Sequence, residues 1–269
     1  MKSILLHVYD DTGLEGRMQA AFDLARAFGG HVTCLHATPL EDYLANDPLT
    51  AVLLPVELSN KMKHLGETLQ ARVEARFRAE DVSWDWIHVN DLPASSLARL
   101  SIVSDIVIVS HAGPAYQKDE PRPLAAAVAT EGRAPVLAVF ESLRRLDLTR
   151  PVLIAWNGSP ESAAAMRASL PLLKLASNVQ LLEVDEKVPC YPRDIAARYL
   201  ARHGVEVEMV HRPPLDSGVA DTIERAAFDL GAGMIVMGAY GHSRLREFLL
   251  GGVTRNLLRE CGLPLFLAH

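Results

Sequence analysis

The chain has 269 residues, 49% of them hydrophobic and 22% charged, which is the composition of an ordinary globular protein. Its formal net charge of -6 argues against a broad nucleic-acid-binding surface, which would need a basic face. No apolar stretch reaches the roughly 20 residues that span a bilayer, and residues 4–8 are too short for a signal peptide. We therefore expect a cytoplasmic protein that binds neither nucleic acid nor membrane. Its three cysteines, Cys34, Cys190 and Cys261, include no C-x-x-C pair and are expected to be reduced.

The first half of the chain alternates apolar strands with helical patterns. Strands are expected over residues 4–8, 31–37, 105–110 and 134–140, and Trp84 and Trp86 alternate with polar residues as one face of a further strand would. Residues 38–59 contain three prolines and several acids, which predicts an irregular loop or lid. Residues 141–150 are charged and have no hydrophobic period, so they are expected to join two units.

The second half repeats the first. Residues 4–8 align with 152–156 and residues 31–37 with 179–185, both at an offset of 148, whereas 105–110 align with 233–238 at 128. The first half therefore holds 148 − 128 = 20 extra residues, most of them expected in 38–59. Each half predicts an α/β domain with a doubly wound, parallel, five-stranded sheet, the domains being residues 1–143 and 150–269. The helix expected at 193–202 is short.

Small residues follow one apolar strand near the C-terminus. The strand over residues 234–237 ends at Gly238, and Gly241, Gly251 and Gly252 follow before a helical pattern. Glycines allow the backbone to approach a ligand closely, and the free N–H groups at a helix start favour an anion. The segment therefore predicts a phosphate site, and the alternative is that the glycines only shape a turn.

These residues resemble the universal stress protein family in its tandem form. The family signature is G-x2-G-x9-G-[ST], and Gly238, Gly241 and Gly251 keep every glycine spacing. The resemblance covers nearly the whole chain and implies an adenine nucleotide alpha hydrolase-like fold that binds ATP. It also implies that residues 136–140 and 265–269 pair across a pseudo-twofold axis, giving an intramolecular pseudo-dimer, with a homodimer of the whole chain left open.

The nucleotide-binding residues that the resemblance implies lie at two strand tips and along the glycine segment. They are Ala155, Trp156, Asn157, Val184, Met237, Gly238, Gly241, His242, Gly251, Gly252, Val253 and Thr254. Two of them depart from the family. Gly252 replaces a serine or threonine, although its N–H remains and Thr254 is close by. Asn157 replaces the usual aspartate, so Mg²⁺, if it accompanies ATP, would be held mainly by phosphates and water.

The first half departs further from the signature. Gly113 matches Gly241, but Ser110 replaces Gly238 and the pair 122–123, Arg-Pro, replaces Gly251-Gly252. Because proline has no N–H to donate, this half is not expected to hold ATP in the same way. It is either a partner domain or a pocket for another ligand. It also carries six of the ten histidines: His7, His31, His36, His64, His88 and His111.

Two further hypotheses concern chemistry. Cys34 and His36 share one face of a strand and His88 ends another, which suggests a metal, but the spacing is weak and packing or surface roles are favoured. No catalytic set is visible: near the glycine segment only His242 and Glu247 could act as a base, and neither has an evident orienting partner. The sequence thus favours an ATP-binding stress protein in which the nucleotide controls conformation or an unknown protein partner. A slow ATPase or metal-using enzyme is the alternative.

Overall fold

A computed structural model describes residues 1–39, 55–111, 123–184, 191–239 and 252–269, and for residues 55–62 it describes the backbone alone. Five residues singled out above lie outside these ranges: Gly241, His242 and Gly251 of the glycine segment, together with Gly113 and Cys190. None of the helices in the described ranges combines the length and apolar character that crossing a bilayer would need.

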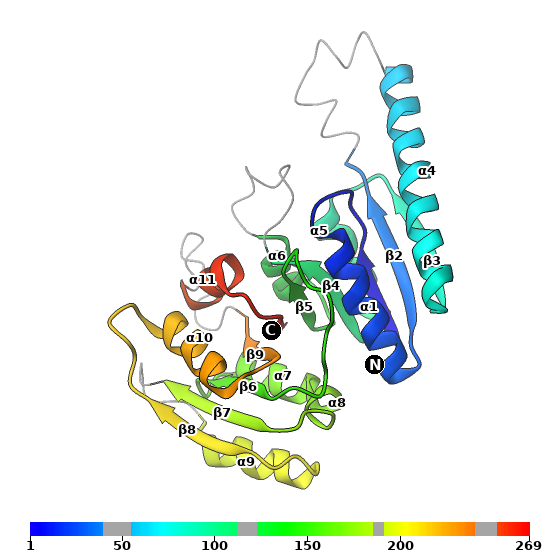
Figure 1. Ribbon diagram of the computed structural model, residues 1–269. Coiled ribbons are helices and arrows are strands. Elements are labelled where there is room, and N and C mark those ends of the chain that lie inside the picture. Colours follow the sequence, from blue (N-terminus) through cyan, green and yellow to red (C-terminus); the bar gives the residue numbers. More distant parts are fainter. Residues whose placement is uncertain (40–54, 112–122, 185–190, 240–251) are drawn as a thin grey trace.

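The ten strands form one sheet, with the order β3-β2-β1-β4-β5-β10-β9-β6-β7-β8 (Figure 1). Within each half all neighbouring strands are parallel, and both halves have the same order. The predicted pair of doubly wound five-stranded sheets is therefore confirmed. The strands are β1 (Ser3–His7), β2 (His31–Ala37), β3 (Trp84–Val89), β4 (Ile106–Ser110), β5 (Val136–Val139), β6 (Val152–Trp156), β7 (Val179–Val184), β8 (Glu208–Arg212), β9 (Met234–Gly238) and β10 (Leu265–Ala268).

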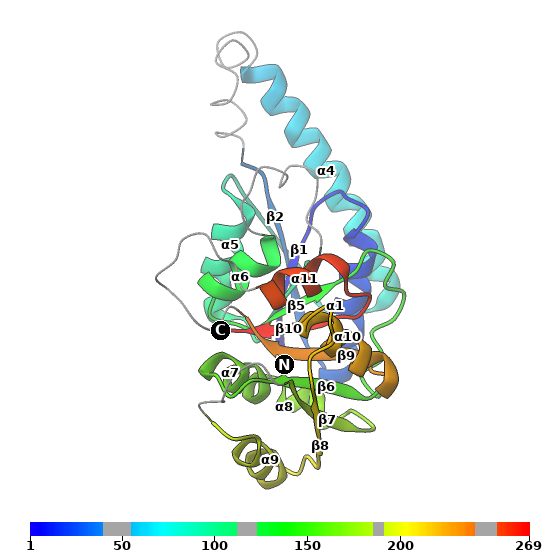
Figure 2. The same cartoon turned by 90° about the vertical axis from the view of Figure 1, so that its left-hand side faces the viewer.

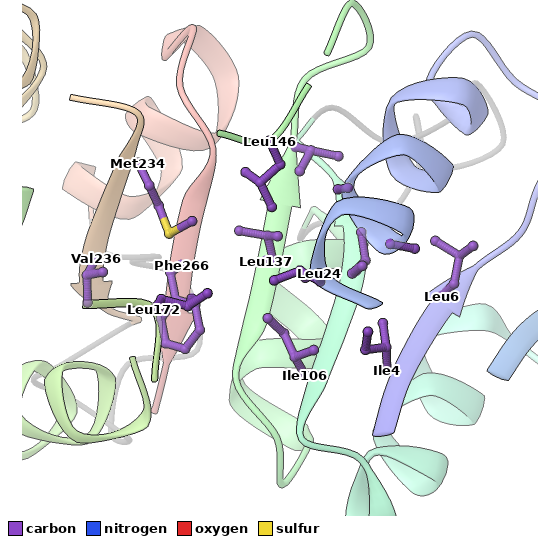
Figure 3. Close-up of a cluster of buried hydrophobic side chains, with 14 of the residues drawn as sticks. Ile4, Leu6, Leu24, Ile106, Leu137, Leu146, Leu172, Met234, Val236 and Phe266 are labelled. Atoms are coloured by element: carbon purple, nitrogen blue, oxygen red, sulfur yellow. The ribbon is translucent and has the colours of Figure 1, made fainter. Parts of the chain in front are cut away.

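The two halves join at β5 and β10, which pair antiparallel with Leu137 opposite Phe266. The pairing across a pseudo-twofold axis is thus confirmed, and it covers two strand edges that would otherwise be open. Leu137 and Phe266 are both fully buried and belong to a hydrophobic cluster that continues from one half into the other (Figure 3). Burying one such side chain stabilises a fold by about 1.5–3 kcal/mol, so the junction is part of the core.

Helices cover both faces of the sheet (Figures 1 and 2). Alternate residues of a strand point to opposite faces, so Ile4 and Leu6 meet one helical layer and Leu5 meets the other. The first layer comprises α1 (Leu14–Phe28), α4 (Pro55–Glu80), α7 (Pro160–Ala168), α8 (Leu170–Leu173) and α9 (Arg193–Arg202). The second comprises α5 (Pro93–Leu100) with the short 3-10 helix η1 (Ser101–Val103), α6 (Leu124–Glu131), α10 (Val219–Leu230) and α11 (Gly252–Glu260).

Helix α4 corrects the last five residues of the loop or lid expected over residues 38–59, of which residues 40–54 lie outside the described ranges. Residues 55–59 are helical, and α4 has 26 residues where its counterpart α9 has 10, a difference of 26 − 10 = 16. Much of the surplus in the first half is therefore helix. Leu69, Val73 and Phe77 bury one stripe of α4 at four-residue spacing, whereas its amino-terminal part projects beyond the sheet (Figure 2).

The segment that joins the halves is packed rather than free. Leu143 and Leu146 are buried, and the Leu146 N–H donates a hydrogen bond of 2.8 Å to the Asp23 carboxylate of α1. Gly16 of α1 lies so close that a Cβ there would be 2.8 Å from the Phe140 carbonyl oxygen. Residues 141–150 have no hydrophobic period, so the sequence did not show that Leu143 and Leu146 would be buried. These two leucines hold the junction against α1.

Candidate functional site

The candidate site of the second half lies where strand order reverses, between β6 and β9. The chain leaves β6 toward β7 on one side, and β9 pairs with β6 on the other. In doubly wound folds, ligands bind at the carboxyl ends of the strands beside such a reversal. Trp156 and Gly238 end these two strands, and Val184 ends the neighbouring β7. The structure thus brings Ala155–Asn157, Val184, Met237 and Gly238 to one edge of the sheet.

The β6–α7 turn is held by its own hydrogen bonds. Ser159 caps α7, with its hydroxyl accepting from the Ser162 N–H at 3.1 Å and Pro160 at the first helical position. The Asn157 Oδ1 accepts from the Ser159 N–H at 3.1 Å. The amide oxygen of exposed Asn157 therefore stabilises the turn, and its NH₂ group is the part that can donate to a ligand.

Trp156 and Gly238, which end β6 and β9, both pack against other parts of the second half. The Trp156 side chain is 4% exposed, lies in the core, and donates from Nε1 to the Tyr191 carbonyl at 3.2 Å. A Cβ on Gly238 would lie 2.5 Å from the Ser162 nitrogen and 2.9 Å from the Glu161 Cβ. The close backbone approach that Gly238 permits is therefore an approach to α7.

Gly252 differs from Gly238 in its surroundings. It is exposed at the first residue of α11, and a Cβ there would meet no atom of the described residues within 4 Å. Because α11 connects β9 to the parallel strand β10, it begins at the same edge as the strand tips. Val253 is half-buried and Thr254 is buried. An open helix start, whose first N–H groups have no partner within the helix, is the chemistry that an anion needs.

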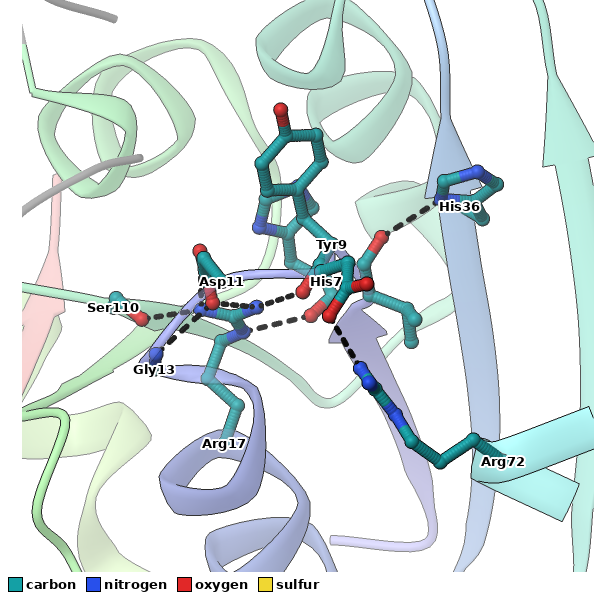
Figure 4. A network of polar contacts seen from close by, with 10 residues as sticks. His7, Tyr9, Asp11, Gly13, Arg17, His36, Arg72 and Ser110 are labelled. Atoms are coloured by element: carbon teal, nitrogen blue, oxygen red, sulfur yellow. Dashed lines mark hydrogen bonds and ion pairs between the residues drawn. The ribbon is translucent and has the colours of Figure 1, made fainter. Parts of the chain in front are cut away.

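The first half fills the equivalent place with Arg17, a residue that the sequence analysis missed (Figure 4). Arg17 is fully buried on α1, and each of its three guanidinium nitrogens donates to a protein oxygen. Nε donates to the His7 carbonyl at 2.9 Å, Nη1 donates to Ser110 Oγ at 2.5 Å and to Asp11 at 3.2 Å, and Nη2 donates to the Tyr9 carbonyl at 3.0 Å. Nη2 also forms an ion pair with Asp11 at 2.9 Å. The signal available in the sequence was a basic residue within the apolar stripe of α1, three residues after Leu14.

The two halves build the same helix-to-strand contact in opposite ways. In the first half the glycine is on the helix side: a Cβ on Gly13 would lie 2.4 Å from Ser110 Oγ of β4. In the second half the glycine is on the strand, at Gly238, and Glu161 and Ser162 approach from the helix. Ser110 at the place of Gly238 is therefore accommodated, and its hydroxyl binds Arg17 instead of leaving space for a ligand.

Three histidines of the first half lie at the carboxyl ends of β1, β2 and β3. Burial, and next the Arg17 guanidinium, hold the pKa of His7 well below its ordinary value, and neither of its ring nitrogens has a hydrogen-bond partner in the described part of the chain. Burial also lowers the pKa of His36, whose Nδ1 donates to the Val8 carbonyl at 3.1 Å and whose ring stacks on His88 at 5.3 Å. Within the described ranges, no three His, Cys, Asp or Glu side chains come together as metal ligands.

His111 follows β4 and lies near the second half. Its Nε2 donates to the Ala138 carbonyl at 3.0 Å, and its side chain is buried. Burial lowers its pKa to about 4, against the opposing effect of backbone hydrogen bonds to Ala138 and Cys261. Cys34 and Cys261 are buried free thiols, and burial raises the pKa of Cys261 to about 11.

Two doubly wound halves with a common strand order define a tandem α/β protein of the adenine nucleotide alpha hydrolase-like class. Residues 149–269 match the model of the universal stress protein family. The second half of the chain is therefore similar to this family, and the first half repeats its fold.

Solved structures agree with this assignment. A universal stress protein from Archaeoglobus fulgidus DSM 4304 is similar in structure, with a TM-score of 0.75 and 15% sequence identity. The match covers 98% of this chain and 97% of that protein's chain. A protein of unknown function from Pseudomonas aeruginosa PAO1 is similar over 100% of this chain and 92% of its own, with a TM-score of 0.59 and 18% identity. At such identities the likeness shows the fold. No curated protein matches the chain in sequence.

Proposed function

We propose that the second half binds ATP and that nucleotide occupancy controls the conformation or a protein partner of a cytoplasmic stress protein. The domains that carry this function are residues 1–143 and 150–269. The observation that supports it most directly is the open start of α11 at Gly252, beside the strand tips of β6 and β9. The glycine spacing around it is that of the family's ATP-binding members.

We further propose one nucleotide site per chain. The equivalent place in the first half holds the Arg17 guanidinium, which donates four hydrogen bonds to protein oxygens and forms an ion pair with Asp11. A nucleotide there would have to displace a buried cation and break an ion pair to Asp11, which costs several kcal/mol. The first half thus acts as the partner domain of the second.

A substitution at Gly252 tests the site. Gly252→Asp places a carboxylate in open space at the helix start, where it repels phosphates but suits the helix dipole. We expect calorimetry to show ATP affinity reduced at least about tenfold, equivalent to about 1.4 kcal/mol, with the melting temperature unchanged or raised. Gly262→Asp is the matched control, because Gly262 is equally open but follows the other end of α11.

Equal ATP affinity in the wild type and both variants would contradict the site, and absence of ATP binding by the wild type would contradict the function. The alternative, a slow ATPase at the same place, predicts phosphate release that falls in Gly252→Asp. A binding switch predicts nucleotide that is recovered intact from the protein.

A further inference from the structure

Glu161 presents a buried carboxylate oxygen that lacks a partner. It occupies the first turn of α7, and its Oε2 is buried without a hydrogen bond to any of the described residues. Its Cβ is 2.9 Å from where a Cβ on Gly238 would be, so the residue stands directly beside the tip of β9. An ionised oxygen buried in this way is unfavourable unless a cation or a donor reaches it.

The Ser159 and Ser162 donors of the turn are already engaged with other atoms of the turn. The Ser159 N–H donates to Asn157 and to the Ser162 hydroxyl, and the Ser162 N–H donates to the Ser159 hydroxyl. The hydroxyl of Ser162 also donates to the Ser159 carbonyl. None of the hydrogen bonds that cap α7 therefore involves the Glu161 Oε2.

The first half has a buried arginine at the place where the second half has Glu161. At the offset of 148 residues that aligns β1 with β6, Gly13 corresponds to Glu161 and Arg17 corresponds to Ala165. In the first half the Arg17 Nη1 lies 2.9 Å from where a Cβ on Gly13 would be. The first half thus places a protein cation at this point, and the second half places an anion there and an alanine where the arginine was.

We propose that Glu161 supplies a carboxylate to a divalent cation, Mg²⁺ in the simplest case, that accompanies the nucleotide in the second half. The proposal rests on the proposed nucleotide site. Mg²⁺ is usually held by one or two carboxylates together with phosphates and water. Asn157 has no negative charge, and its oxygen is engaged with the Ser159 N–H, so Glu161 replaces the missing aspartate.

One carboxylate does not hold Mg²⁺ alone, and the described residues offer no three acidic, histidine or cysteine side chains together. The cation is therefore expected to bind only with the nucleotide. Without a cation, the carboxylate repels the phosphates. ATP affinity should accordingly depend strongly on Mg²⁺, and this dependence should originate at Glu161.

The test is calorimetric titration of ATP into the full chain with Mg²⁺ and with EDTA. In the wild type we expect Mg²⁺ to raise affinity at least tenfold. In Glu161→Gln this gain should be largely lost, and ATP in EDTA should bind more tightly than to the wild type. Glu206→Gln, an exposed carboxylate before β8 at the opposite edge of the sheet, is the matched control and should behave as the wild type.

An equal Mg²⁺ gain in the wild type and Glu161→Gln would overturn the role of Glu161 while leaving the nucleotide site intact. No ATP binding by the wild type in either buffer would overturn both proposals. Paramagnetic resonance of Mn²⁺ on the wild type needs no variant: bound Mn²⁺ is expected with ATP and not without it, and equal binding without ATP would contradict the proposal. Melting temperatures check that each variant is folded.

Discussion

Acidification should destabilise the protein through His111. This side chain is 6% exposed, and burial lowers its pKa from the ordinary value of 6.5 to about 4. Because the folded pKa is the lower one, the unfolded chain takes up the proton first. The contribution of neutral His111 to the free energy of unfolding is therefore complete above pH 6.5, and it is lost as the pH falls toward 4. At about 1.4 kcal/mol per pH unit, the change from pH 7 to pH 5 removes about 2 kcal/mol.

Urea unfolding followed by circular dichroism at pH 7 and pH 5 measures this loss. His111→Gln keeps a side-chain N–H donor for the Ala138 carbonyl but cannot titrate, so it should lose about 2 kcal/mol less than the wild type. His203→Gln, at an exposed position, controls for the loss of a histidine as such. An acid-induced loss in His111→Gln equal to that of the wild type would refute the reasoning. His7 and His36 shift in the same direction, so a residual loss is expected in the variant.

Two further predictions concern stability. Arg17→Met removes the buried cation and leaves the Asp11 carboxylate without its partner. The free energy of unfolding, measured by urea titration, should therefore fall by about 3–5 kcal/mol. A fall of less than about 1 kcal/mol would contradict the structural role of Arg17. Gly238→Ala places a Cβ 2.5 Å from the Ser162 nitrogen and should cost about 1–3 kcal/mol by the same titration. Gly262→Ala, in open space, should change stability by no more than about 0.5 kcal/mol, and equal losses in the two glycine variants would show that the contact at Gly238 is unimportant.

The fold was predictable because it depends on repeated local patterns. Short apolar runs separated by helical stretches specify buried parallel strands, and the internal repeat specified two halves. Strands β5 and β10 pair where the family resemblance indicated. The extent of α4 was not predictable, since prolines near residue 55 suggested a loop although Pro55 begins the helix.

The site was predictable in its backbone and less so in its side chains. Spacing in the chain placed Gly238 at the strand tip but did not reveal that α7 packs against it. In the sequence, Arg17 could not be distinguished from the other charged residues of its helix. The oxygens that it contacts belong to β1, β4 and the turn between β1 and α1, which only the fold brings together. Such contacts depend on tertiary structure, so local periodicity carries little information about them.

The comparison of halves suggests how one fold acquired two roles. In the first, Arg17 neutralises the crevice from within and fastens α1 to β4. In the second, the Glu161 carboxylate oxygen and the start of α11 at Gly252 have no partner among the described residues. Under our proposal, a bound nucleotide and its cation take these places in the second half.

The stoichiometry of ATP binding to the wild-type chain tests the central claim most directly. Calorimetry with Mg²⁺ present should give one ATP per chain, bound by the second half. Two ATP per chain would contradict the closure of the first crevice by Arg17, and no binding would contradict the assignment of the second half as a nucleotide site.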